Sequence, residues 1–347
     1  MTKKLFILFG FFLPLFGQAQ IPLGYYDSAE GLIGSELREA LRDIIDDHTI
    51  RSYGDLWIDF QSTDVNADGL VWDMYSDVPG GTSDYTYTFS VDQCGNYAQE
   101  GDCYNREHSF PKSWFGGSVP PMYTDLFHLV PTDGYVNGQR GNYPYGEVDS
   151  PTWTSTNGSK RGPCSYPGYT GTVFEPIDEY KGDFARGYFY MLTRYMNNIS
   201  SWNSDMLSGG DFSPWAKQLL LDWAAADTVS QKEIDRNNEI YSIQENRNPF
   251  IDHPEFIHDI WDLASSINEI LVNDPRVNYS NSTLYFYDLK ELYSDISVYS
   301  LSGALVYQSS LEGNTDELAI DLNQGLYIID LRGMDHRSAL KLMVISN

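Results

Sequence analysis

The residues with the clearest chemistry are an adjacent pair, Glu107 and His108, and two residues that follow a short span later, Asn137 and Arg140. Histidine can act as a general base on water, and carboxylate and amide oxygens are ligands that Mg²⁺ accepts. A guanidinium can neutralise a phosphate. Metal-assisted cleavage of a phosphodiester needs a base, a divalent cation and a positive group for the phosphate. The pattern therefore indicates chemistry on a phosphodiester.

Two extended segments and a short helix are expected to position these side chains. Residues 104–110 have no helical period and run into a proline, and residues 125–130 form a short apolar segment that also ends at a proline. Thr132 and Asp133 are both good N-caps for a short helix that contains Val136 and Asn137, and Gly141 is placed to close that helix. The order around the site is therefore strand, loop, strand, helix.

The sequence flanking the site predicts a mainly helical domain. Residues 35–48 place apolar side chains on one helical face, with Ser35 as the expected cap. Residues 57–60 and 70–74 have the character of short strands. Four later segments repeat apolar residues at helical spacing: 184–197, 214–226, 230–241 and 254–271.

The character of the chain changes after residue 275, where only short alternating runs remain. Turn residues separate these runs at the spacing of a small β-sandwich: 284–286, 296–299, 304–307, 326–329 and 342–345. The predicted fold class is therefore α+β, with a strand–strand–helix site inside a mainly helical domain and a small C-terminal β-sandwich.

The N-terminus has the features of a secretory signal peptide. Two lysines precede an apolar run over residues 5–16, and Gly17 and Ala19 place small residues before a cleavage site. The run is too short for a membrane span, and no later segment has the required apolar length. We therefore expect an exported protein with no stable membrane span.

Cysteine usage agrees with export. Cys94 and Cys103 flank a short loop and are candidates for a disulfide in an oxidising compartment. Cys164 is then left over. A buried free thiol is favoured over a catalytic nucleophile, because no base lies near Cys164 in the sequence.

The formal charge of −27 at first argues against a polyanionic substrate. The charge is unevenly distributed, however: residues 104–200, which hold the candidate site, carry 8 basic and 9 acidic residues. A nearly neutral region in an acidic chain can still bind phosphate, especially through a bound metal.

One further motif suggests an ion. Residues 64–69 (DVNADG) have the pattern that starts a calcium-binding loop, but position twelve holds Tyr75 instead of the bidentate glutamate. A polar turn is the favoured interpretation of this segment.

Three segments around the candidate site together resemble the bacterial endonuclease I family: residues 105–114 (NREHSFPKSW), 125–137 (DLFHLVPTDGYVN) and 140–144 (RGNYP). A later segment, residues 246–252 (NRNPFID), is also similar to one in the family. Together they cover most of residues 21–272. The resemblance implies a secreted nuclease with the ββα-metal, or His-Me finger, core.

The resemblance also implies roles for the matching residues. It makes His108 the general base and Glu107 and Asn137 the ligands of Mg²⁺, with Mn²⁺ and Ca²⁺ as alternative ions. Arg140 lies within a family motif, and we infer that Arg140 and Arg106 contact the substrate phosphate.

The chain departs from the family pattern next to the site. Many relatives have a histidine directly after the Asp-Leu pair, where this chain has Phe127 followed by His128. The role of that position is therefore open, and we expect His128 to be a structural hydrogen-bonding group instead of a second base.

The C-terminal region resembles the sorting domain of proteins exported by the type IX secretion system of Bacteroidetes. The matching segments are residues 296–303 (ISVYSLSG), 325–329 (GLYII) and 341–345 (KLMVI). The resemblance implies that the secretion machinery is a partner and that the protein is secreted, either released or held at the cell surface.

These observations combine into one hypothesis: a signal peptide over residues 1–19, an endonuclease I-like domain over 20–272 and a sorting domain over 277–347. We predict a monomeric, metal-dependent endonuclease that hydrolyses DNA, with RNA as a further candidate substrate, shows little sequence specificity and leaves 5′-phosphate ends.

The alternative from another class is a surface-displayed binding protein that keeps the nuclease fold without turnover. The high content of tyrosine and tryptophan would suit such contacts. The intact set of Glu107, His108 and Asn137 argues against it, and a cleavage assay with and without EDTA separates the two.

Overall fold

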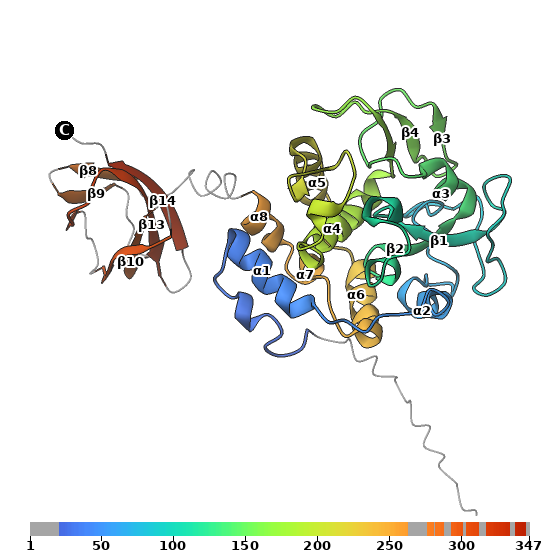
Figure 1. The fold of residues 1–347 in the computed structure, drawn as a ribbon, viewed down its shortest axis with the longest axis horizontal. Helices are drawn as coiled ribbons and strands as arrows, with labels where there is room; N and C mark the ends of the chain where they lie inside the picture. Colours follow the sequence, from blue (N-terminus) through green and yellow to red (C-terminus); the bar gives the residue numbers. More distant parts are fainter. Residues whose placement is uncertain are drawn as a thin grey trace, which may run out of the picture. The chain divides into compact units, whose positions relative to one another are not determined.

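The structure is a computed structural model, and it describes residues 21–262, 276–280, 282–287, 293–300, 303–311, 317–333 and 337–344 (Figure 1). The chain divides into two compact units, Met1–Trp261 and Asp262–Asn347. The predicted signal peptide, residues 1–19, lies outside the described residues, and so do residues 263–272 of the predicted nuclease domain.

Two strands and a helix in the first unit form the expected strand–strand–helix motif. Strand β1 (Tyr104–His108) pairs antiparallel with β2 (Leu129–Asp133), with Tyr104 opposite Asp133 and His108 opposite Leu129. Helix α3 (Gly134–Arg140) follows β2 without a loop. The Asp133 carboxylate accepts a hydrogen bond from the Val136 amide at 2.8 Å and so caps α3. Gly141 ends the helix, as the sequence predicts.

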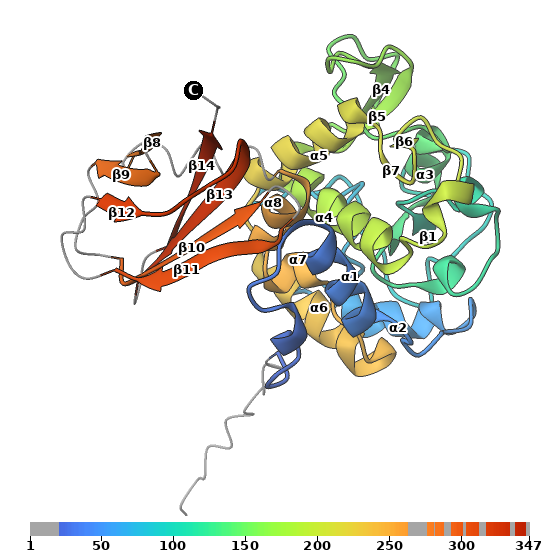
Figure 2. The same cartoon turned by 60° about the vertical axis from the view of Figure 1, so that its left-hand side comes forward.

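Helices make up most of the remainder of this unit (Figures 1 and 2). They are α1 (Gly34–Ile45), α2 (Leu56–Thr63), α4 (Asp178–Arg194), α5 (Pro214–Ala226), α6 (Gln231–Gln244), α7 (Pro249–Asp252) and α8 (Glu255–Trp261). Short strands form two further antiparallel sheets, β3 (Trp153–Thr154), β4 (Lys160–Pro163) and β5 (Thr172–Glu175), and β6 (Leu207–Ser208) with β7 (Asp211–Phe212).

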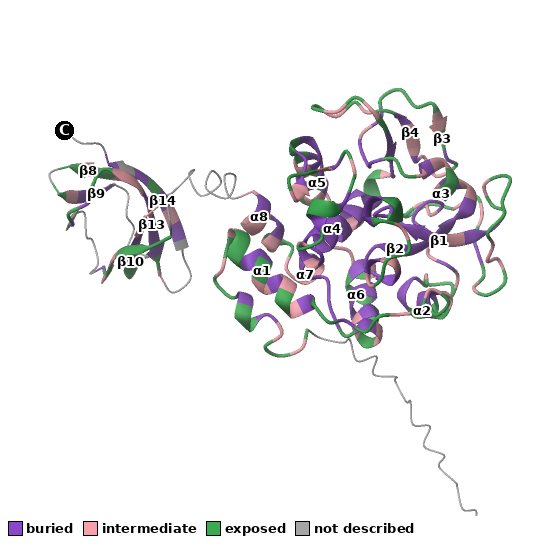
Figure 3. Ribbon diagram, in the orientation of Figure 1, coloured by how far each residue is buried: buried purple, intermediate pink, exposed green. Residues whose placement is uncertain are grey.

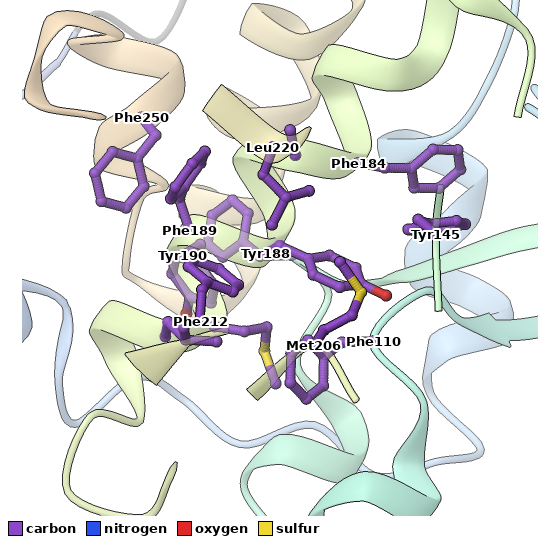
Figure 4. Packing of buried hydrophobic residues seen from close by; sticks show 14 of the residues in the cluster. Phe110, Tyr145, Phe184, Tyr188, Phe189, Tyr190, Met206, Phe212, Leu220 and Phe250 are labelled. Atoms are coloured by element: carbon purple, nitrogen blue, oxygen red, sulfur yellow. The ribbon is translucent and has the colours of Figure 1, made fainter. Parts of the chain in front are cut away.

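Helix α4 is the centre of the hydrophobic core of this unit. It is buried on nearly every face from Tyr180 to Thr193 (Figure 3), because α1, α5 and α7 all pack against it. Tyr188, Phe189 and Tyr190 on α4 pack among aromatic side chains from distant parts of the chain (Figure 4). Tyr188 contacts Phe110, which lies just after β1, at 5.0 Å between ring centroids. The strand that carries the candidate site is therefore fixed to the core.

The N-terminal expectations need correction at three places. Residues 57–60 belong to helix α2 and not to a strand, because Leu56 and Phe60 are both buried at helical spacing. Residues 70–74 form no strand, only one isolated bridge from Val71 to Val65. Ser35 lies inside α1 and makes no capping bond.

The segment with the calcium-loop pattern is a polar turn. The Asn66 side chain accepts hydrogen bonds from the amides of Asp68 and Leu70, at 3.0 and 2.9 Å. The Asp64 carboxylate pairs with Arg236 at 2.9 Å. The oxygens that would start a calcium site are therefore used within the protein.

The second unit is rich in strands. One sheet has the order β11 (Leu305–Ser310), β10 (Asp295–Ser300), β13 (Gly325–Arg332) and β14 (Arg337–Val344). The other has the order β12 (Glu317–Ala319), β9 (Thr283–Tyr287) and β8 (Arg276–Ser280). Apolar side chains from both sheets, including Leu284 and Ile329, form one buried cluster. The α+β fold class with a strand-rich C-terminal unit is thus confirmed.

Within the described residues, no helix combines the length and the apolar character that crossing a membrane requires.

Candidate active site

The predicted site residues surround one cavity of about 200 Å³. The lining residues are Tyr53, Arg106, Glu107, His108, Pro111, Lys112, Asn137, Arg140, Gly141 and Asn142. All five residues predicted as base, ligands or substrate contacts are among them. Strand β1 contributes the base and the carboxylate, and helix α3 contributes the amide and the guanidinium, so the β1–β2–α3 motif brings the set together.

A backbone carbonyl determines the tautomer of His108. The Nε2 atom of the ring lies 3.0 Å from the carbonyl oxygen of Tyr123. A carbonyl oxygen only accepts hydrogen bonds, so Nε2 carries the proton in the neutral ring and Nδ1 keeps its lone pair. No described residue donates a hydrogen bond to Nδ1. His108 is therefore held as a neutral imidazole with one free acceptor nitrogen.

The surroundings of His108 favour the neutral form. Burial, together with the nearby His128, Lys112 and Arg106, lowers the pKa of His108 to about 3, although the hydrogen bond to the Tyr123 carbonyl opposes the fall. The imidazole is therefore uncharged at neutral pH and is available to accept a proton.

A stack of aromatic rings supports His108. Its ring lies parallel to that of Tyr123, with centroids 5.2 Å apart and an interplanar angle of 16°. Tyr53 stacks on Tyr123 at 4.6 Å. The guanidinium of Arg106 lies 3.5 Å from the ring centroid of Tyr53 and 4.2 Å from that of Trp57. Arg106 is thus held between two aromatic faces at the edge of the cavity.

Phe127 and His128, where the sequence departs from the family pattern, are both buried packing residues. Phe127 is buried in the core against Tyr190, with ring centroids 4.5 Å apart. His128 is also buried, and its Nε2 donates to the carbonyl of Met122 at 2.6 Å. Its ring lies 5.6 Å from that of His108. His128 therefore holds the chain segment whose next carbonyl orients His108, which fits the expected structural role.

The Glu107 carboxylate is buried and tightly bound. It is only 3% exposed, and its Oε1 accepts a hydrogen bond from the Tyr75 hydroxyl at 3.1 Å. The same oxygen lies 3.2 Å from Nη1 of Arg140. Burial raises the pKa of Glu107, while Arg140 and Tyr75 oppose that rise. Glu107 is therefore fixed in one orientation before any ligand binds.

Arg140 is a buried structural cation and not an exposed one. It is 1% exposed and donates to the carbonyl oxygens of His108 and Ser109 and to the Tyr188 hydroxyl. Burial acts to lower its pKa, but the Glu107 carboxylate and the neighbouring tyrosine hydroxyls together outweigh burial, and the net pKa is raised. The geometry assigns Arg140 to the support of Glu107. Its one nitrogen without a hydrogen-bond partner, Nε, is buried, so the inferred phosphate contact stays a prediction.

The side-chain amide of Asn137 is oriented by a neighbouring amide. Nδ2 of Asn137 donates to Oδ1 of Asn105 at 2.7 Å. The Oδ1 atom of Asn137 accepts no hydrogen bond from any described residue. An amide that donates on one side and keeps its oxygen free on the other is suited to contribute that oxygen to a cation.

Helix α3 is braced by the loop that precedes β1. The structure pairs Cys94 with Cys103, whose Cα atoms are 5.6 Å apart, and the enclosed loop packs on α3. A Cβ atom at Gly134 would lie 2.6 Å from Cδ1 of Tyr97, and one at Gly138 would lie 2.7 Å from the Tyr97 hydroxyl oxygen. The two glycines therefore let Tyr97 lie across α3 on both sides of Asn137.

The start of α3 is held by buried carboxylates. Asp133 accepts a second hydrogen bond from the Tyr87 hydroxyl at 2.6 Å, and its own amide donates to Asp73 at 2.8 Å. Burial raises the pKa of Asp73 to about 7. These contacts fix the helix from which Asn137 projects.

The donor set fits a single hydrated hard cation. Within the described ranges, no group of three or more His, Cys, Asp and Glu side chains could hold a metal. One carboxylate and one amide oxygen at the same cavity match Mg²⁺, which keeps most of its water ligands in such sites. A site for zinc would need more nitrogen or sulfur ligands.

Several residues at the cavity were not identified from the sequence. Tyr53 lines the cavity from a turn, and Tyr123, in the short 3₁₀-helix Met122–Thr124, stacks on Tyr53 and His108. Neither has a motif of its own, and both reach the site only through the fold. Lys112 and Asn142 lie inside the family-like segments and could have been found there as polar side chains close to the core motif. Lys112 is exposed at the cavity, with Nζ 5.5 Å from the ring centroid of Tyr123.

Comparison with known proteins identifies the class of the first unit. The endonuclease I family matches residues 33–255. The "Extracellular ribonuclease" of Bacillus subtilis (strain 168) is 34% identical over 248 residues, covering 68% of this chain and 78% of that protein. The protein of the same name from Bacillus amyloliquefaciens is 36% identical over 249 residues, with the same coverage.

A third relative carries a different name. The "Endonuclease-1" of Buchnera aphidicola subsp. Baizongia pistaciae is 33% identical over 129 residues, covering 37% of this chain and 46% of that protein. The chain therefore belongs to the endonuclease I family and is a nuclease.

The second unit has its own match. The secretion system C-terminal sorting domain matches residues 278–346, in agreement with the resemblance seen in the sequence. The protein is therefore secreted or held at the cell surface.

Proposed function

We propose that this protein is a metal-dependent endonuclease in which His108 activates water against a phosphodiester. The observation that carries the proposal is the bond from Nε2 of His108 to the Tyr123 carbonyl, which leaves Nδ1 as a proton acceptor in a cavity shared with Glu107 and Asn137. A base poised in its neutral form beside two oxygen ligands is the arrangement that hydrolysis of a phosphodiester requires.

The chemistry of the chain's own residues follows from this geometry. Nδ1 of His108 takes one proton from a water molecule as that water attacks phosphorus, and the bond from phosphorus to the 3′ oxygen breaks. The new phosphate end stays on the 5′ side of the following nucleotide. The 3′ oxygen leaves with the bonding electron pair, takes a proton from solvent and becomes the 3′ hydroxyl of the preceding nucleotide, and His108 later returns its proton to solvent. The Tyr123 carbonyl stabilises the imidazolium that forms, because it continues to accept from Nε2.

Glu107 and Asn137 are the residues that would hold Mg²⁺ at this cavity. When bound, the ion would supply positive charge to the phosphate and to the departing oxygen. Arg140 would keep the Glu107 carboxylate ionised and in place. Arg106 and Lys112, which line the same cavity, are the cations placed to meet the phosphate.

The substrate class is proposed from the relatives. Two of them are named extracellular ribonuclease and one is named endonuclease-1, and their similarity to this chain supports an endonuclease with RNA among its substrates. We propose DNA as a substrate as well, as the resemblance to the endonuclease I family implies. Little sequence specificity is expected, because Arg106 and Lys112 would meet the phosphate, and phosphate contacts carry no sequence information. The sorting domain supports the type IX secretion machinery as a partner, and we propose a monomer.

The test is cleavage of plasmid DNA and of RNA by the wild-type protein and by the His108→Ala variant. The wild type should cleave with Mg²⁺ and stop with EDTA, and the variant should lose about 10²- to 10⁴-fold in rate. Equal melting temperatures of the two proteins would show that the fold is intact. Full activity of the variant, or cleavage that EDTA does not affect, would refute the proposed mechanism.

A further inference from the structure

An exposed tyrosine stands next to the cavity and has no part in the chemistry proposed above. Tyr143 follows Gly141 and Asn142, two residues that line the cavity, and is 40% exposed. Its backbone is held, because its amide donates to the Arg140 carbonyl at 3.3 Å and the next carbonyl, of Pro144, accepts from Phe174 at 2.9 Å. An aromatic ring is thus presented to solvent on an anchored backbone.

An arginine from a different sheet lies beside this tyrosine. The guanidinium carbon of Arg161, on β4, is 6.0 Å from the ring centroid of Tyr143. Nη1 of Arg161 donates to the backbone and side-chain oxygens of Gln139, at 3.2 and 2.8 Å. Gln139 lies on α3, so Arg161 is tied to the helix that carries Asn137. Its other guanidinium nitrogens donate to no residue in the described part of the chain.

Lys160, the residue before Arg161 on β4, differs from Arg161 because its charge is paired with a carboxylate. Side chains alternate between the faces of a strand. Nζ of Lys160 bonds to Glu175 at 3.2 Å, so its charge is compensated within the β4–β5 sheet. Arg161 has no carboxylate partner among the described residues. Of this pair, Arg161 is the cation available to a ligand.

We propose that Tyr143 and Arg161 form a subsite for an unpaired nucleotide that flanks the reacting phosphate. The exposed Tyr143 ring would stack on the base, and Arg161 would bind the adjoining phosphate with its free donors. A base inside a duplex already stacks on its neighbours, so only an unpaired base can use the tyrosine. The subsite rests on the proposed function and adds a preference for single-stranded nucleic acid.

Binding without turnover tests the subsite directly. In the His108→Ala background, the affinity for a fluorescent single-stranded oligonucleotide should fall about 5- to 100-fold with Tyr143→Ala. Tyr143→Phe keeps the ring and should bind as the parent does. Arg161→Ala should also weaken binding, whereas Lys160→Ala, which removes an equal charge one residue away, should leave affinity within about twofold because Lys160 is already paired.

A base-by-base comparison separates stacking from charge. A series of oligonucleotides each lacks the base at one position, and that position differs from one oligonucleotide to the next. The parent protein should bind one of them more weakly than it binds the intact strand, because the missing base is the one that stacks on Tyr143. The Tyr143→Ala variant should bind this oligonucleotide and the intact strand equally. A duplex of the same sequence should bind equally to the parent and to Tyr143→Ala.

The outcomes distinguish the two proposals. If the wild type cleaves nucleic acid but Tyr143→Ala binds every strand as the parent does, the subsite is wrong and the proposed function stands. If the wild type cleaves nothing while Tyr143→Ala still loses affinity, the proposed function is wrong and the subsite stands. A loss of equal size for duplex and single strand would also overturn the subsite. Melting temperatures identify any variant that fails to fold.

Discussion

Two sides of the cavity are built from different kinds of contact. The base wall consists of His108, Tyr123 and Tyr53, and the ligand wall consists of Glu107, Asn137 and Arg140. The base wall uses stacked rings and a backbone carbonyl, with no carboxylate hydrogen-bonded to the imidazole among the described residues. The ligand wall uses a buried ion pair and paired amides. Adjacent residues of one strand, Glu107 and His108, thus enter opposite environments.

The difference explains how neighbouring side chains can have opposite tasks. A carboxylate beside His108 would favour the imidazolium and remove the free base. Neutral contacts orient the ring without adding charge, and burial, helped by the nearby His128, Lys112 and Arg106, keeps it unprotonated. Glu107, in contrast, requires a nearby positive charge, because burial without a cation would favour the neutral form of its carboxyl group. Arg140 supplies that cation.

The largest expected effect comes from breaking the ion pair of the ligand wall. Arg140→Met leaves the Glu107 carboxylate buried without its partner, which should lower the free energy of unfolding by about 3–5 kcal/mol. Urea unfolding measures the loss. Arg42→Met, which removes an exposed pair with Asp43, is the control and should change stability by less than about 1 kcal/mol. A loss for Arg140→Met as small as the control's would mean that the pair does not hold the wall.

The second effect tests the brace on helix α3. Replacing Cys94 and Cys103 together by serine should lower the free energy of unfolding by about 2–4 kcal/mol, because the loop that carries Tyr97 is then no longer closed by a disulfide. It should also raise the Mg²⁺ concentration needed for half-maximal cleavage, since α3 carries Asn137. Cys164→Ser is the matched control, and its thiol lies outside this loop. If the Mg²⁺ concentration needed for half-maximal cleavage were unchanged, the disulfide-closed loop would not contribute to the position of Asn137.

The third prediction concerns pH and the support of α3 by Asp73. The folded state holds the proton of Asp73 up to about pH 7, whereas the unfolded state releases it near the ordinary value of 3.8. Between these values the folded state binds more protons, so this contribution to stability is present at acid pH and is lost as pH rises toward 7. The slope is at most about 1.4 kcal/mol per pH unit.

Asp73→Asn removes one titrating group and should reduce the slope of the free energy of unfolding against pH between pH 4 and 7, as followed by urea unfolding at each pH. Burial also raises the pKa of Glu233 to about 7, so a smaller slope of the same sign remains. Asp68→Asn, in the exposed turn, should leave the slope as in the wild type. If the slope of the free energy of unfolding against pH were the same in Asp73→Asn as in the wild type, Asp73 would not be a group that causes it.

The smallest expected effect tests the base wall. Tyr123→Leu keeps the carbonyl that orients His108 but removes the stacked ring, a contact worth about 0.5–1.5 kcal/mol. The cleavage rate should fall about 2- to 10-fold, while the Mg²⁺ requirement stays unchanged. Tyr123→Phe keeps the ring and should match the wild type. If Tyr123→Leu altered the Mg²⁺ requirement instead of the rate, the two walls would not be independent.

The sequence predicted local structure best where short-range signals agree. The helix over 214–226 begins at a proline and keeps its apolar spacing, and the structure shows it with the same bounds. The caps of α3, Asp133 and Gly141, were also identified in advance. The prediction of a strand over residues 57–60 was wrong, because so short an apolar run shows no clear periodicity. The burial of Leu56 and Phe60 in the core favours a helix there.

The sequence by itself determined the residue types of the site and its order of strand, strand and helix. It could not determine how the chemical groups are paired. The proton position on His108 depends on the carbonyl of Tyr123, and the burial of Arg140 depends on Tyr188 in helix α4. Hydrogen bonds and desolvation act between groups far apart in the chain, so only the tertiary structure decides which nitrogen is a base and which cation stays inside.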